Sequence, residues 1–127
     1  MIVVDASAAV LGLLNDGDAR ALLATETLAV PHLIDAEIVN ALRSQIQRSA
    51  VDVADARRAL DVWARLGLQR VGIVGLLPRV WELRDNLTAC DATYVAVTET
   101  LDCALLTADA RLAGAPGIRC EISLVQR

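Results

Sequence analysis

Four acidic residues stand where predicted strands end or predicted helices begin: Asp5, Glu37, Asp91 and Asp109. Asp5 directly follows the apolar run at residues 2–4, and Asp109 follows the strand-like segment at residues 104–107 after one intervening residue. In a parallel α/β sheet, the carboxyl ends of the strands form the edge where ligands bind. Carboxylates that gather there repel one another unless a divalent cation or a shared proton relieves the repulsion. The pattern therefore suggests a metal site, and a metal site suggests hydrolysis.

Small hydroxyl residues accompany two of these acids: Ser7 lies two positions after Asp5, and Thr107 two positions before Asp109. Each acid also has an ordinary structural explanation. Asp5 and Asp109 are suitable helix N-caps, Asp91 is a partner for a capping threonine, and Glu37 fits a solvated helix face. The combination of acids favours a cation site, because Mg²⁺ and Mn²⁺ prefer oxygen ligands.

The order of elements predicts a parallel sheet that is covered by helices on both faces. Continuous apolar runs and strand-forming residues predict five strands, at 2–4, 28–30, 69–74, 104–106 and 120–124. Helical periodicity and capping residues predict seven helices, at 6–14, 18–24, 34–48, 52–66, 76–86, 88–100 and 109–113. Strands that alternate with helices along the chain are typical of this α/β architecture.

Length and composition indicate one globular domain that spans residues 1–127, with 55% hydrophobic and 22% charged residues. The apolar share suggests that some surface is buried against a partner, and the Ala/Leu-rich helices at 6–14 and 18–24 are the candidates. Residues 1–5 lack the basic region of a secretory signal, so we expect none there, and no apolar run in the sequence is long enough to span a membrane. We expect three reduced, buried cysteines and a cytoplasmic location.

The charged and aromatic residues exclude several functional classes. A net charge of −4 and an aromatic content of 2% argue against a general electrostatic attraction to nucleic acid and against base stacking as its main contact. All 12 basic residues are arginines. A Walker A motif needs a lysine, and receiver domains and haloacid-dehalogenase-type phosphatases normally use one. The chain is therefore a poor match to all three.

The acids and their neighbours form an ordered set of short motifs: Asp5-Ala6-Ser7, Glu37-x-x-Asn40, Cys90-Asp91-Ala92 and Thr107-x-Asp109. In order and spacing, this set resembles the PIN-domain ribonucleases, and in particular the VapC toxins of toxin–antitoxin pairs. The resemblance covers the whole chain. One departure is Cys90, because family members often carry an aromatic residue there.

The resemblance implies a PIN-like three-layer α/β/α sandwich with a central parallel sheet of four to five strands. It also implies that the four acids bind Mg²⁺ or Mn²⁺ and that the protein hydrolyses RNA phosphodiester bonds. Three polar residues would support the acids: Ser7, Asn40 and Thr107. The implied partners are a second copy of the chain, in a homodimer, and a small antitoxin. The alternative is a PIN-like module that binds RNA or protein with little or no catalysis.

The arginines leave further alternatives open. Arg84, which precedes Asp91, could hold a substrate phosphate bidentately, or it could stabilise the C-terminus of a helix. Four arginines on the predicted helix pair could form an RNA-facing patch, although a solvated helix face is the interpretation we favour: Arg43, Arg48, Arg57 and Arg58.

Overall fold

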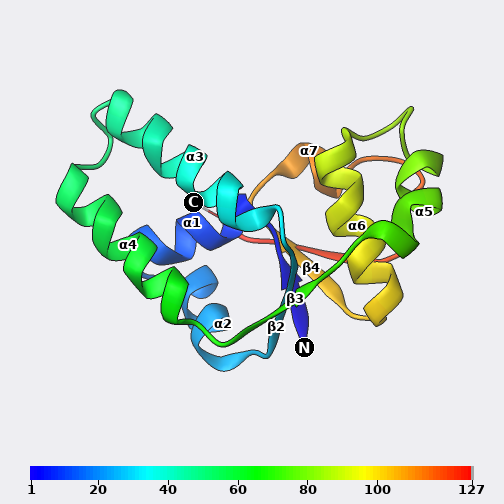
Figure 1. The fold of residues 1–127 in the computed structure, drawn as a ribbon, viewed down its shortest axis with the longest axis horizontal. Coiled ribbons are helices and arrows are strands. Elements are labelled where there is room, and N and C mark those ends of the chain that lie inside the picture. The colour runs from blue at the N-terminus through cyan, green and yellow to red at the C-terminus, as the bar shows by residue number, and fades with distance from the viewer. Residues whose placement is uncertain (127) are drawn as a thin grey trace.

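The computed structural model describes residues 1–126, which form a sheet of five parallel strands between two groups of helices (Figure 1). The strands are β1 Ile2–Val4, β2 Leu28–Pro31, β3 Leu68–Val71, β4 Ala104–Thr107 and β5 Glu121–Leu124. Their order across the sheet is β3-β2-β1-β4-β5. The chain thus builds outward from β1 to β3 and then returns to the other side of β1. The switch point, where such sheets bind ligands, lies between β1 and β4.

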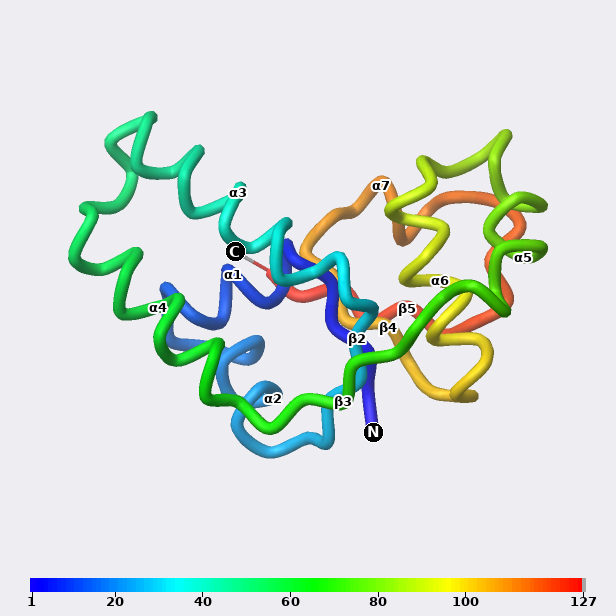
Figure 2. Tube along the Cα trace, viewed as in Figure 1, coloured from blue at the N-terminus to red at the C-terminus, as the bar shows by residue number. Residues whose placement is uncertain are grey.

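The helices cover both faces of this sheet, as the three-layer prediction requires (Figure 1). One group is α1 Ala6–Leu14, α2 Asp18–Thr25, α3 Ile34–Gln47 and α4 Val53–Arg65. The other group is α5 Leu77–Glu82, α6 Ala89–Leu101 and α7 Ala110–Ala113. Helices α3 and α4 form an antiparallel arm that extends away from the sheet (Figure 2).

The third strand is shorter than predicted. The sequence suggested a strand at 69–74, but β3 ends at Val71 and is followed by a 3-10 turn, η1, at Val74–Leu76. Strand β3 lies at the edge of the sheet and pairs with β2 up to Pro31. Because β2 ends at Pro31, residues beyond Val71 have no neighbouring strand to pair with.

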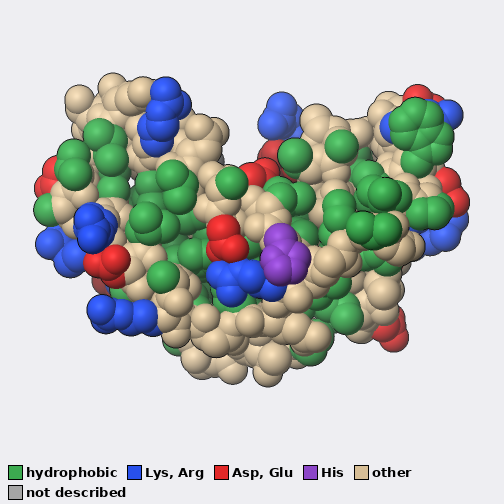
Figure 3. Space-filling view, in the orientation of Figure 1, with side chains coloured by type: hydrophobic (Ala, Val, Ile, Leu, Met, Phe, Trp, Pro, Cys, Tyr) green, Lys and Arg blue, Asp and Glu red, His purple; other side chains and the backbone are tan. Residues whose placement is uncertain are grey.

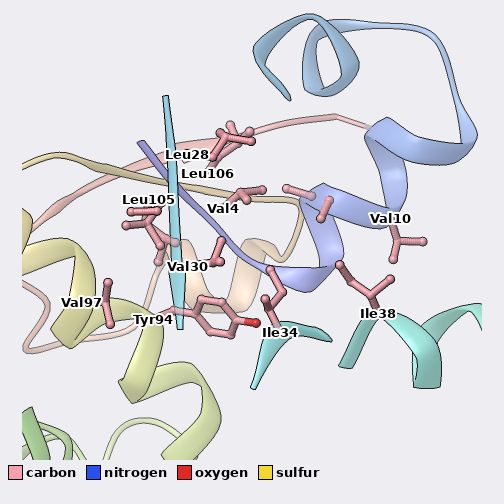
Figure 4. Close-up of a cluster of buried hydrophobic side chains, with 14 of the residues drawn as sticks. Val4, Val10, Leu28, Val30, Ile34, Ile38, Tyr94, Val97, Leu105 and Leu106 are labelled. Carbon is pink, nitrogen blue, oxygen red and sulfur yellow. The ribbon is translucent and has the colours of Figure 1, made fainter. Parts of the chain in front are cut away.

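Helix α6 lies at the centre of the core and is buried over seven consecutive residues, 92–98. It packs on β1, β2 and β4. Figure 4 shows Tyr94 and Val97 of this helix within the cluster of buried apolar side chains. The hydroxyl of Thr98, which is fully buried, donates to the carbonyl oxygen of Tyr94 at 2.7 Å. This bond satisfies a polar group that would otherwise be costly to bury.

Most of helix α1, which we predicted to form a surface for a partner, is covered within the chain, and only its end, at Leu13 and Leu14, lines an open cavity. None of its residues is exposed, and the helix packs against α2, α3 and α4. A Cβ atom on Gly12 would lie 2.7 Å from Leu23 Cδ1, so the missing side chain permits the close contact between α1 and α2. Large exposed apolar side chains lie mainly elsewhere: Val39, Val53, Val62, Val74, Leu77 and Trp81.

The cysteines are free, as predicted, but they are not all buried: Cys90 is exposed, and Cys103 and Cys120 are partly buried. Cys90 lies at the N-terminus of α6, where solvent reaches one side of the helix. Among the described helices, none is long and apolar enough to cross a membrane.

An ion pair on the other side of the core joins α5 to α6. The Arg79 guanidinium donates to both carboxylate oxygens of Glu99, at 2.7 and 3.0 Å, and to the carbonyl oxygen of Gly117 at 2.8 Å. Burial raises the pKa of Glu99, but the hydrogen bonds from Arg79 and from the Arg119 amide outweigh it, so the pKa lies below its usual 4.5. The pair therefore stabilises the fold at neutral pH and loses this effect as acid protonates Glu99.

We expect Glu99→Gln to lower the free energy of unfolding at pH 7 by about 1.5–3 kcal/mol, since the side chain is only 14% exposed and accepts charge-assisted bonds. Because the folded-state pKa lies below 4.5, the difference from the wild type should shrink as the pH falls below that value. Urea unfolding at both pH values measures this. Glu82→Gln is the control, because Glu82 pairs with the same arginine but is 59% exposed, and it should cost less than about 0.5 kcal/mol. Equal losses in the two variants would contradict the prediction.

Candidate active site

Asp5 lies at the switch point of the sheet, where β1 ends and α1 begins. The register pairs Val4 with Leu106, and the Asp5 amide donates to the Leu106 carbonyl oxygen at 3.1 Å. The Asp5 side chain is the N-cap of α1, because its Oδ1 accepts from the Ala8 amide at 3.0 Å. The ordinary explanation as a cap is therefore correct for this acid. A cap leaves lone pairs on a carboxylate, so it does not exclude a second role.

Hydroxyl groups surround the Asp5 carboxylate. Ser7 Oγ donates to Asp5 Oδ1 at 2.6 Å, and Thr107 Oγ1 donates to Oδ2. The same two hydroxyls accept from the amides of Ala108, at 2.9 Å, and Asp109, at 3.0 Å. Ser7 and Thr107 thus connect the start of α1 to the end of β4 and fix the orientation of the Asp5 carboxylate.

The Asp5 carboxylate is only 6% exposed, and burial raises its pKa. The bonds from Ser7, Thr107 and the Ala8 amide lower this pKa and the negative charge of Asp91 raises it, and the net shift is upward. An ionised Asp5 therefore lies in a site that favours a nearby positive charge.

Glu37 reaches the same site from the first turns of α3, where it is half-buried. Its Oε1 accepts a hydrogen bond from the hydroxyl of Tyr94 on α6. Burial raises the pKa of Glu37, and the charges of Asp91 and Asp5 add to this, although the bond from Tyr94 opposes it. Glu37 is thus within electrostatic reach of both Asp5 and Asp91.

Asp91 approaches from the N-terminus of α6. Thr88 is the N-cap of this helix, and its Oγ1 accepts from the Asp91 amide at 3.2 Å. The predicted capping box is only half formed, because the Asp91 carboxylate makes no return bond to Thr88 among the described residues. This carboxylate is half-buried and remains free to act in the site.

Asp109 is directed toward a different neighbour. It is the N-cap of α7, and its Oδ1 accepts from the Arg111 amide at 2.9 Å. The Arg111 guanidinium also pairs with Asp109 Oδ2 at 3.3 Å and lowers the pKa of Asp109. Arg111 lies within electrostatic reach of Asp91 as well. A positive side chain therefore stands beside the fourth acid.

The structure brings Asp5, Glu37 and Asp91 into mutual electrostatic reach and pairs Asp109 with Arg111. Figure 3 shows a hollow between the α3–α4 arm and the side formed by α6 and α7, with acidic side chains at its floor. Within residues 1–126, no three His, Cys, Asp or Glu side chains converge tightly enough to hold a metal ion as they stand. The donor chemistry nevertheless fits a hard cation, because the groups are carboxylate and hydroxyl oxygens. The negative charge of Asp91 raises the pKa of both Asp5 and Glu37, so a cation would relieve repulsion at the site.

The other predicted residues are less closely involved. Asn40 is exposed on α3 and makes no side-chain hydrogen bond within the described part of the chain. Arg84 is exposed, with its guanidinium 4.6 Å from the centre of the Trp81 ring and its Nη1 donating to the Trp81 carbonyl oxygen. All four arginines of the arm are exposed, and two of them pair with acids of α4: Arg57 with Asp61 and Arg58 with Asp55.

Sequence reasoning missed two residues of this site, Tyr94 and Arg111. Tyr94 is 57 positions from its partner Glu37, so no local pattern indicates the contact. Arg111 is two residues after Asp109, so an ion pair with this neighbouring acid could have been considered from the sequence.

Comparison with known proteins identifies the family. The model of the PIN domain family matches residues 2–118. Ribonuclease VapC9 of Mycobacterium tuberculosis is 55% identical over 127 residues, which are 100% of each chain. Ribonuclease VapC1 of the same organism is 43% identical over 129 residues, covering 98% of this chain and 97% of the relative.

The fold also has a counterpart among solved structures. VapBC2 from Rickettsia felis, crystallised with a DNA fragment from its promoter, superposes with a TM-score of 0.66 and covers 96% of this chain and 98% of its own. Its sequence identity is 15%, so this likeness concerns the fold alone. The chain therefore belongs to the PIN-domain family and, within that family, to the VapC group.

Proposed function

We propose that the protein is a metal-dependent endoribonuclease toxin, built as a single PIN-like domain over residues 1–127. The observation that supports this proposal is that the charge of Asp91 acts on both Asp5 and Glu37 near the β1–β4 switch point of a VapC-type fold. Carboxylates that lie near one another repel, and a bound cation relieves this repulsion. A cation can also activate a phosphodiester bond such as those of RNA for hydrolysis. An enzyme that acts on cellular RNA would work in the cytoplasm.

The acids would hold Mg²⁺ or Mn²⁺, with Asp109 as the fourth ligand once it is released from Arg111. A cation held there would supply activation of a water nucleophile and neutralisation of the charge that develops on the phosphoryl oxygens. Ser7 and Thr107 keep the Asp5 carboxylate in one orientation, because each donates a hydrogen bond to a different oxygen. Arg111, at 92% exposure, is free to turn from Asp109 to a substrate phosphate.

The proposed protein partners are a small antitoxin and a second copy of the chain. A cavity of about 920 Å³ lies between the end of α1 and the α3–α4 arm. Its lining includes Leu13, Ile46 and the exposed valines Val53 and Val62. An amphipathic antitoxin segment could place its apolar side in this groove. We assign this groove to the antitoxin.

Purified protein, freed of antitoxin, is expected to cleave RNA in the presence of Mg²⁺ or Mn²⁺ and to stop when EDTA is added. A screen of total cellular RNA, with cleavage sites mapped by sequencing of the new ends, measures this. Folded protein that cuts no RNA with any divalent cation, yet retains RNA on a filter, would favour the alternative of a binding module. Cleavage that persists in EDTA would contradict the metal-dependent mechanism.

A further inference from the structure

Tyr94 is a buried tyrosine whose hydroxyl has one partner. The side chain is 1% exposed, and its hydroxyl donates to Glu37 Oε1. In Figure 4 the ring extends from α6 through the core, with its oxygen directed toward the start of α3 near Ile34. Within the described residues, no other acceptor is hydrogen-bonded to this hydroxyl, and Glu37 has no other hydrogen bond from a side chain. The two groups therefore depend on each other.

The hydrogen bond between Tyr94 and Glu37 restricts the Glu37 side chain more than the Tyr94 side chain. The aromatic ring is fixed by core packing, whereas a glutamate side chain has several rotamers and loses entropy when it is held in one. The charges of Asp5 and Asp91 also repel the Glu37 carboxylate and favour its escape to solvent. The hydrogen bond from a rigid, buried donor opposes both effects, because its loss would leave the tyrosine hydroxyl unsatisfied in the core.

We propose that Tyr94 is a positioning residue, which holds the Glu37 carboxylate of α3 beside Asp5 and Asp91 and leaves Glu37 Oε2 available to a cation. The contact also joins α3 to α6, the two helices that face each other across the hollow. Only the part of this inference that concerns cation binding rests on the proposed function. The position of Glu37 can be tested without metal.

Tyr94→Phe tests the proposal, because it removes one oxygen and keeps the ring in the core. Crystal structures of the metal-free variant should show the Glu37 side chain turned away from Asp5 and toward solvent. Isothermal calorimetry should show Mn²⁺ binding weakened by about 10- to 100-fold, the usual effect of losing a group that orients a metal ligand. Thr98→Val is the matched control: it removes another buried hydroxyl of α6, bonded only to the Tyr94 carbonyl, and should change neither result.

The outcomes separate this inference from the proposed function. If Glu37 keeps its place in Tyr94→Phe and Mn²⁺ binding is unchanged, Tyr94 is an ordinary core residue and the inference is overturned, while the metal site stands. If Tyr94→Phe and Thr98→Val weaken Mn²⁺ binding equally, the effect comes from the packing of α6, and the inference is again overturned. A wild type that binds no Mn²⁺ overturns the metal site, and the metal-free structures of the variants then decide whether Tyr94 positions Glu37.

Discussion

Asp5→Asn is expected to lower metal-dependent RNA cleavage by at least about 100-fold while the metal-free fold stays intact. Asparagine is as good an N-cap as aspartate, and its carbonyl oxygen can accept from Ala8 and Ser7 as the carboxylate does. The variant also removes one member of a group of repelling charges, so the metal-free protein should be as stable as the wild type or more stable. What it loses is a charged ligand for a hard cation.

Melting temperatures with EDTA and with millimolar Mn²⁺ distinguish the cap from the ligand. A ligand that binds only the folded state stabilises it by about 2.7 kcal/mol at a concentration 100 times its Kd. The wild type should show such a gain, and Asp5→Asn and Asp109→Asn should lose most of it.

Asp52→Asn is the matched control for a helix cap. Asp52 is the N-cap of α4 and accepts from the Asp55 amide at 2.8 Å, but it is exposed on the arm and is not among the acids of the site. This variant should keep the full Mn²⁺-induced shift. Equal shifts in the wild type, Asp5→Asn and Asp109→Asn would show that neither acid is a ligand, and they would leave both with the role of a cap.

The positions of the acids could be predicted because they follow from local signals. Asp5 ends an apolar strand and begins a helix, and the parallel sheet then determines which edge it occupies. Helix α3 shows an equally strong local pattern: its apolar residues recur at helical spacing, and Ile34, Ile38 and Leu42 are the ones that it buries. Element order and hydrophobic period are enough for this level of description.

Contacts between distant elements could not be predicted in the same way. The end of β3 depends on where its neighbour β2 ends, and the bond between Tyr94 and Glu37 depends on how α3 and α6 pack across the sheet. The Ala/Leu-rich helix α1 illustrates the same limit. Its composition suggested a surface for a partner, but the arm and α2 cover most of it within the chain and leave its end, at Leu13 and Leu14, beside the cavity. Composition gives the amount of apolar surface and not what covers it.

Trp63→Ala is expected to lower the free energy of unfolding by about 3–5 kcal/mol. Helix α4 buries Ala56, Ala59 and Trp63, so the tryptophan supplies most of the apolar area that attaches this helix to the rest of the protein. Its Nε1 also donates to Asp35 Oδ1 at 2.8 Å, and Asp35 pairs with Arg70. The substitution therefore removes both packing and a tether at the start of α3.

Trp81→Ala is the control, because Trp81 is 67% exposed on α5 whereas Trp63 is 2% exposed, and it should cost less than about 0.5 kcal/mol. Urea unfolding gives both values, and hydrogen exchange of the folded Trp63→Ala protein locates the damage. Amides of α3 and α4 should exchange faster than those of α6, because the arm loses its main attachment to the core while α6 keeps its own. Since Glu37 lies two residues after Asp35 on α3, a loosened arm should also weaken Mn²⁺ binding. Uniformly faster exchange with unchanged Mn²⁺ affinity would instead mean that the arm and the acid site are independent.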